Sequence, residues 1–152
     1  MILEKEEIED ICKKYGIENY TINSDGTIDV NGDVNLYNRG LTKLPLKFRN
    51  ISGGFYCFNN QLTSLEGAPN SVSGDFYCQN NNLTSLEGAP KSVGGNFDCQ
   101  NNKLTSLEGA PISVSGYFYC YDNPIYDELG DIDCKLYIKS LYRDKKLEEI
   151  LK

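Results

Sequence analysis

The sequence lacks histidine and any long apolar run, and its 15 Lys and Arg residues are outnumbered by 22 Asp and Glu. Without histidine, Ser-His-Asp and Cys-His catalysis are excluded, and so is a zinc site with imidazole ligands. No segment approaches the roughly 20 apolar residues that cross a bilayer, and the acidic N-terminal segment is not a secretory signal. The net charge of −7 argues against nucleic acid and against an acidic membrane surface, because phosphate groups attract clustered Lys and Arg.

What the 152 residues contain instead is a repeat with a period of 21 residues, in a chain long enough for one domain. The octapeptide LTSLEGAP occurs three times without change, starting at residues 62, 83 and 104. A weaker copy precedes these, and a truncated copy ends at Asn123 and Ile125. The columns that keep the step include Phe55, Phe76, Phe97 and Phe118, then Cys57, Cys78, Cys99 and Cys120, and then Val72, Val93 and Val114.

The repeat unit, F-x-C-x-x-N-x-L-x-x-L-E-G-A-P-x-S-V-x-G-x, combines two kinds of local structure. The F-x-C alternation has period two, so it predicts a short strand with Phe and Cys facing inward. Stacked coils join such strands into a parallel sheet with about 4.8 Å between neighbours. The segment from Glu to the last Gly has no helical period, so it predicts a return by turns and extended chain. One coil cannot bury enough apolar surface to fold alone, so the coils must stack as an array.

This unit resembles the leucine-rich repeat, L-x-L-x-x-N-x-L-x-x-L/P, with Phe, Cys, Asn, Leu and Leu at the matching places over residues 34–125. It looks most like the short repeats of secreted bacterial effectors, and LTSLEGAP is similar to repeat proteins of tailed bacteriophages and some bacteria. The resemblance implies an α/β solenoid with a short parallel β-sheet, a non-helical convex side and helical caps at both ends. It also implies that one column of side chains turns inward and bonds adjacent coils, namely Asn60, Asn81, Asn102 and Asn123. In the first coil Arg39 takes this place, so the ladder is expected to start imperfectly.

The segments outside the repeats predict caps for the two ends of the solenoid. Residues 1–33 are expected to form an N-terminal cap, with a helix over residues 3–15 and a hairpin that turns at residues 24–26. About 4.5 coils span residues 34–125, and residues 126–152 are expected to form a helical C-terminal cap within the same folding unit. The basic residues 143–146 in that cap are interpreted as a solvated helix face. The apolar positions at helical spacing there are Leu136, Leu141, Leu147 and Leu151.

Two further columns could carry chemistry but are interpreted as structural. Four thiols at steps of about 4.8 Å cannot surround zinc tetrahedrally, and parallel inward side chains reach disulfide geometry with difficulty. The cysteines are therefore expected to pack in the core and stay reduced, which indicates a cytoplasmic setting, the host cytoplasm for a phage gene. Glu66, Glu87 and Glu108 are expected to form a solvated row, because calcium needs six to eight oxygens and a dedicated loop. No metal, cofactor or catalytic residue is expected.

If Phe and Cys face inward, the residues between and beside them face outward on the sheet. These outward residues are rich in Tyr and vary between otherwise similar coils, and Tyr-rich patches with scattered acids anchor protein partners. The alternative is that Tyr and Phe occupy these positions only for strand propensity and cross-strand packing. The predicted partner-binding residues are Tyr37, Tyr56, Phe58, Asp75, Tyr77, Gln79, Asp98, Gln100, Tyr117, Tyr119 and Tyr121.

Together these patterns predict a non-enzymatic interaction protein that binds a protein partner through a Tyr-rich sheet face. The resemblance suggests a phage-encoded or bacterial protein that acts on a host or viral protein, for example as an antagonist of a defence system. The alternative is a structural virion or assembly component that self-associates through the solenoid. An enzyme that works with Tyr, Asp and Glu alone has the least support.

Overall fold

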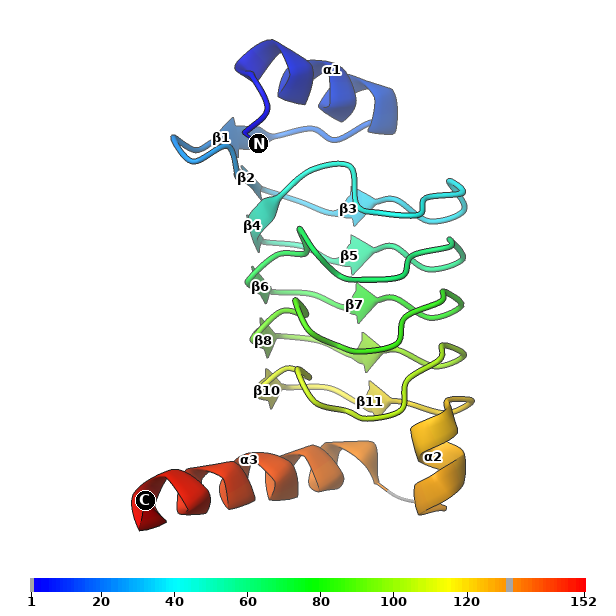
Figure 1. Ribbon diagram of the computed structural model, residues 1–152. Helices are drawn as coiled ribbons and strands as arrows, with labels where there is room; N and C mark the ends of the chain where they lie inside the picture. Colours follow the sequence, from blue (N-terminus) through cyan, green and yellow to red (C-terminus); the bar gives the residue numbers. More distant parts are fainter. Residues whose placement is uncertain (1, 131–132) are drawn as a thin grey trace.

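The computed structural model describes residues 2–130 and 133–152 and shows a β-solenoid of about four turns with helices at its two ends (Figure 1). Residues 1, 131 and 132, which belong to the predicted caps, lie outside the described residues. Each full turn contributes two short strands. Equivalent strands of successive turns pair in parallel with a spacing of 21 residues, as Phe55 and Phe76 do, so the predicted repeat period is confirmed.

The F-x-C segments form one of two sheets, which we call the Phe sheet. Its strands are all parallel and follow the order β11-β9-β7-β5-β3. The Phe and Cys side chains point into the core as predicted, and the rings of Phe55, Phe76 and Phe97 stack at centroid distances of 5.4 Å. The strands are β3 (Val34–Asn35), β5 (Phe55–Tyr56), β7 (Phe76–Tyr77), β9 (Phe97–Asp98) and β11 (Phe118–Tyr119).

The return segments form a second sheet, which corrects the expectation of a single sheet. The chain returns in extended form as predicted, but its Ser-Val pairs align between coils and extend the ladder, with Gly94 N donating to Val72 O at 2.9 Å. This Val sheet has the order β1-β2-β4-β6-β8-β10, and Figure 1 shows it stacked beside the Phe sheet. Its strands are β1 (Tyr20–Ile22), β2 (Ile28–Val30), β4 (Phe48–Ile51), β6 (Ser71–Val72), β8 (Ser92–Val93) and β10 (Ser113–Val114).

The glycine of each E-G-A-P segment is required by the turn that follows the Leu columns. Gly67, Gly88 and Gly109 have φ values of 89°, 88° and 86°, which side chains rarely tolerate. A Cβ atom on Gly88 would also lie 2.9 Å from the Leu65 carbonyl oxygen of the preceding coil. The backbone conformation and the close approach of two coils therefore both exclude a side chain here.

The asparagine column forms the predicted ladder between coils. Asn81 Oδ1 accepts a hydrogen bond from Leu62 N at 3.0 Å, and Asn81 Nδ2 donates to the carbonyl oxygens of Cys57 and Cys78, each at 3.0 Å. The ladder also reaches the first coil, where Asn60 Oδ1 accepts from the backbone N–H groups 19 and 21 residues earlier. Each coil is thereby bonded to the coil before it.

The N-terminal end is covered by helix α1 (Lys5–Tyr15) and the β1–β2 hairpin, as the sequence predicts. The side chains of Ile8 and Cys12 are buried in the core, and Glu4 and Glu7 form a capping box at the helix N-terminus. Strand β2 pairs antiparallel with β1 and parallel with β4. The hairpin therefore extends the Val sheet.

The C-terminal end is covered by helices α2 (Pro124–Leu129) and α3 (Cys134–Leu151). A helix in the last segment is confirmed, although the apolar residues at helical spacing do not all pack against the solenoid. Cys134 and Ile138 are buried, whereas Leu136 and Leu151 are 66% and 84% exposed. The face is set by contacts with the last coil, and the second half of α3 extends past that coil (Figure 1).

The thiols follow the prediction in the middle of the array and depart from it at the end. Cys57, Cys78 and Cys99 are buried and free, whereas Cys120 forms a disulfide with Cys134, with a Cα–Cα distance of 6.3 Å. The expectation that Cys120 stays reduced is wrong, because its neighbour is a helix that approaches across the solenoid end. The cytoplasmic setting rested on that expectation and stays a prediction. Among the described helices, none is long and apolar enough to cross a membrane.

Candidate partner-binding face

All eleven predicted partner-binding residues lie along the Phe sheet, where they and Asp33, Asn96 and Asp122 make up what we call the Tyr face. Strand pairing aligns Tyr56, Tyr77, Asp98 and Tyr119 in a central row along the solenoid axis. A second row, one step beyond the cysteines at the same 21-residue spacing, contains Tyr37, Phe58, Gln79, Gln100 and Tyr121. A third row, just before the strands, contains Asp33, Asp75, Asn96 and Tyr117.

The aromatic side chains of the Tyr face contact one another in three groups, two toward the N-terminal end and one at the C-terminal end. At the N-terminal end, Tyr37 stacks on Phe58 with a centroid distance of 4.9 Å and an interplanar angle of 4°, and Tyr56 meets Tyr77 edge to face at 5.4 Å. At the C-terminal end, three rings form a continuous strip with centroid distances of 5.9 and 6.0 Å, namely Tyr117, Tyr119 and Tyr121. Within each group the rings therefore hold one another in place, and the three-ring strip forms what we call the C-terminal platform.

The third row fixes the edge of this face through side-chain bonds between coils. Asp33 Oδ1 accepts from Gly54 N at 2.7 Å, Asp75 Oδ1 accepts from Asn96 N at 2.7 Å, and Asn96 Oδ1 accepts from the N–H of the next coil at 2.8 Å. Sequence reasoning missed Asp33, although it stands two repeat periods before Asp75. Gly54 interrupts the row, and the Tyr56 side chain fills the space that a Cβ atom would take there.

Asp98 differs from the prediction, because it lies on the Tyr face but is only 7% exposed. Gln100 covers it, donating from its side-chain amide to Asp98 Oδ2 at 2.8 Å and from its backbone N–H to Oδ1 at 3.1 Å. Burial raises the pKa of Asp98, and the two hydrogen bonds from Gln100 oppose that rise. In the same row as Gln100, the Gln79 side-chain oxygen is buried and accepts no hydrogen bond from any described residue.

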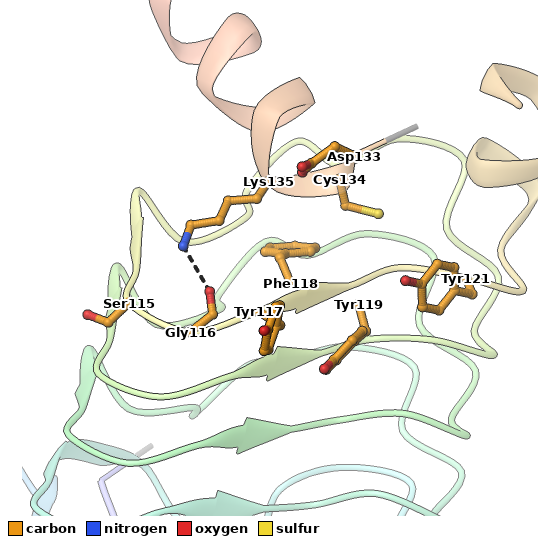
Figure 2. A pocket seen from close by; sticks show the side chains of 9 residues that line it. All are labelled: Ser115, Gly116, Tyr117, Phe118, Tyr119, Tyr121, Asp133, Cys134 and Lys135. Carbon is orange, nitrogen blue, oxygen red and sulfur yellow. Dashed lines mark hydrogen bonds between the residues drawn. The ribbon is translucent and has the colours of Figure 1, made fainter. Parts of the chain in front are cut away.

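The C-terminal platform borders a groove of about 790 Å³ between the last coil and the start of α3. Figure 2 shows Tyr117, Tyr119 and Tyr121 on the coil side, with Asp133, Cys134 and Lys135 across from them. The Lys135 ammonium group donates to the Gly116 carbonyl oxygen at 2.8 Å, so this cation is already bonded to the protein. Tyr126 of α2 extends the aromatic strip by meeting Tyr121 edge to face at 5.2 Å. Neither Tyr126 nor Lys135 lies in the repeat, so no repeat signal marked them.

The other two columns do not form a reactive site among the described residues. Complete burial raises the pKa of Cys57 to about 12 and that of Cys78 and Cys99 well above the usual value, so these thiols stay protonated. The glutamates 66, 87 and 108 are exposed in one row, and Glu108 pairs with Lys145 of α3, which lowers the pKa of Glu108. No cluster of three or more metal-ligating His, Cys, Asp or Glu side chains occurs in the described ranges.

Comparison with known proteins adds no relative to this picture. No protein-family model, no curated protein and no solved structure matches the chain. The function therefore has to be argued from the chemistry of the surface itself.

Proposed function

We propose that the chain is a non-enzymatic interaction module that binds a protein partner through the Tyr face. The observation that carries this proposal is the gathering of seven aromatic side chains on one side of a sheet: Tyr37, Tyr56, Phe58, Tyr77, Tyr117, Tyr119 and Tyr121. Aromatic side chains are rigid and apolar with a polar end, which is why they dominate protein-binding hot spots. The columns needed for stacking are nearly constant between coils, whereas the Tyr face varies from coil to coil.

The exposure of these rings also supports binding over a purely structural role. Tyr37, Tyr117 and Tyr121 are exposed, with Tyr117 reaching 70%, so much of their apolar area still faces solvent. A partner that covers this area gains hydrophobic free energy without reorganising the sheet.

The test is the loss of partner capture when the central row is truncated. A variant with Tyr56, Tyr77 and Tyr119 all changed to Ala should no longer capture its partner from a lysate of the source cell. If the gene belongs to a phage, the lysate is made from infected cells. The matched control truncates the outward side chains of the Val sheet to Ala at Ser71, Ser92 and Ser113. Both variants should keep the circular dichroism spectrum of the solenoid. Unchanged capture by the folded Tyr variant would overturn the proposal.

A second candidate function, a structural assembly component, is favoured by the outer side of α3. This helix leaves four apolar side chains half or more exposed to solvent: Leu136, Leu147, Ile150 and Leu151. Exposed apolar area of this kind promotes association between copies. Sedimentation over a wide concentration range separates the candidates, because a chain that stays monomeric when concentrated is no assembly component.

The resemblance to leucine-rich repeats extends this proposal. The inward asparagine ladder supports placing the array among such repeats, while the Val sheet stands where many of them have a helix. On the same resemblance we propose a phage or bacterial source and a host or viral protein as the partner, and on the free buried thiols of the middle coils we propose a cytoplasmic setting. Identification of the captured protein tests all three.

A further inference from the structure

The charges carried by the Tyr face have a single sign. The strand segments of the Phe sheet with their flanks, residues 33–38, 54–59, 75–80, 96–101 and 117–122, contain four aspartates and neither Lys nor Arg. The aspartates are Asp33, Asp75, Asp98 and Asp122. All 15 basic residues lie elsewhere, and Lys135 at the border is bonded to a backbone carbonyl. The face therefore attracts cations and repels phosphate, whether from nucleic acid or from lipid.

The aspartates stand among the aromatic rings and not apart from them. Burial raises the pKa of Tyr56, and the charges of Asp33 and Asp75 raise it further. Burial likewise raises the pKa of Tyr77, with further contributions from Asp75 and Asp98. The two tyrosine hydroxyls thus lie within electrostatic reach of three carboxylates. A cation placed over either ring meets both the π-face and a carboxylate, a combination that favours Arg and Lys.

A missing hydrogen-bond donor on the same face gives a second, independent indication. The Gln79 side-chain oxygen is buried yet has no donor among the described residues, although buried acceptors are nearly always paired. One coil further on, the amide of Gln100 is occupied by Asp98. If the Gln79 side chain turned toward solvent, a ligand that supplies N–H groups would complete the pairing. The guanidinium group, with five N–H donors and no acceptor, has the required polarity.

We infer that the partner segment bound by the Tyr face is a short extended stretch of chain carrying Arg or Lys side chains, a conclusion that rests on the proposed function. Five coils at about 4.8 Å per step extend over about 19 Å, which about six residues of extended chain cover at roughly 3.3 Å each. The segment lies along the rows, with its cationic side chains over Tyr56 and Tyr77, beside Asp75 and within electrostatic reach of the Asp98 carboxylate that Gln100 covers.

The test uses labelled hexapeptides and fluorescence anisotropy with the full chain. The first set consists of Gly hexapeptides that carry one, two or three Arg residues at different positions. The second set has the neutral isostere citrulline in place of each Arg, and the third set has Glu. We expect at least one Arg peptide to bind at least tenfold more tightly than its citrulline partner. Its affinity should fall steeply between about 50 and 200 mM salt. Failure of every Arg peptide to exceed its citrulline partner would overturn the inference.

A matched pair of charge variants distinguishes specific contacts from the general acidity of the chain. Asp75→Asn with Asp98→Asn removes two carboxylates from the Tyr face, while Glu66→Gln with Glu87→Gln removes two exposed carboxylates from the Glu row. The first variant should weaken binding of the best Arg peptide at least tenfold, and the second should change it less than twofold. Equal effects of the two variants would show that only net charge matters, which contradicts the inference.

The failure of this inference can be told apart from failure of the proposed function. If capture of the natural partner is lost in the tyrosine variant but withstands the Asp75 and Asp98 changes and high salt, the face binds but the cationic segment is wrong. If the tyrosine variant retains capture, the proposed function itself fails. The inference would also be overturned if the chain formed a dimer and the double variant Lys139→Glu with Arg143→Glu abolished that dimer. The occupant of the Tyr face would then be α3 of a second copy.

Discussion

Replacing Asn81 with Ala removes one rung from the middle of the asparagine ladder. Its amide makes four hydrogen bonds to backbone groups of two coils, the longest to the Gln79 carbonyl oxygen at 3.4 Å, and the side chain is buried. The four bonds are not equivalent. The Cys57 and Cys78 carbonyl oxygens each accept a second bond from a neighbouring asparagine, at 3.1 Å in both cases, so they keep a partner in the variant. The Leu62 N–H group loses its acceptor, because no other side chain among the described residues bonds to it.

The expected cost follows from this difference. A buried N–H left without an acceptor costs about 1–3 kcal/mol, and each shared bond contributes about 0.5–1.5 kcal/mol net. Because the two carbonyls remain half satisfied, we expect a total loss of about 3 kcal/mol in the free energy of unfolding. For a domain of marginal stability this is a large fraction of the whole.

The assay is urea unfolding with the disulfide intact, followed by circular dichroism. The matched control is Asn82→Ala, the same chemical change at the adjacent residue, whose backbone N–H donates to Leu62 O at 2.8 Å and is unaffected. We expect the control to stay within about 0.5 kcal/mol of the parent. A loss below about 1 kcal/mol for Asn81→Ala, with an unchanged denaturant slope, would show that the ladder does not hold the coils together.

Three further changes have defined outcomes. Reducing the Cys120–Cys134 disulfide, whose cysteines are 14 residues apart, should lower the free energy of unfolding by about 3 kcal/mol and speed hydrogen exchange in α3. The control, in which both of these cysteines are changed to Ser, should not respond to the reductant. Asp98→Asn should raise the melting temperature at pH 7, because burial raises the pKa of this carboxyl in the folded state and ionising it there costs stability. That cost grows as the pH rises from the unfolded-state pKa to the folded-state pKa, so the gain should vanish below about pH 3, where the carboxyl is protonated in both states. A gain independent of pH would exclude ionisation as its cause. Gly88→Ala should cost about 2–4 kcal/mol through positive φ and the clash with the preceding coil, and a normal melting temperature would contradict the turn geometry.

The repeat period could be predicted from sequence because the same inward-facing residues recur in four successive coils at the same spacing. Phe76 and Cys78 have to face inward in every coil, so their spacing reveals the strand and its inner face. The Val sheet escaped prediction because a strand of two residues, such as Ser92–Val93, has no period of its own. Its pairing exists only once the coils are stacked.

The ends and the Tyr face were predicted less completely, because single contacts determine them. Cys134 lies outside the repeat, so nothing in its spacing marks it as the partner of Cys120. Its bond turns the start of α3 toward the coil and leaves Leu136 outside, against the apolar spacing. The burial of Asp98 depends on the side chain of Gln100 lying over it, which a pattern of inward and outward positions does not encode.

The three identical LTSLEGAP segments have a consequence for the length of the molecule. Each segment enters its coil at the same point, and the middle segment lies between two identical copies, one in the coil before it and one in the coil after it. Joining residue 62 directly to residue 84 would remove 21 residues and still bring Phe55 against Phe97, Asn60 against Asn102, and each end helix against its present neighbour. Genetic exchange between the segments can therefore lengthen or shorten the solenoid by whole coils. Each exchange adds or removes one position in every row of the Tyr face, while the end helices continue to cover the two ends.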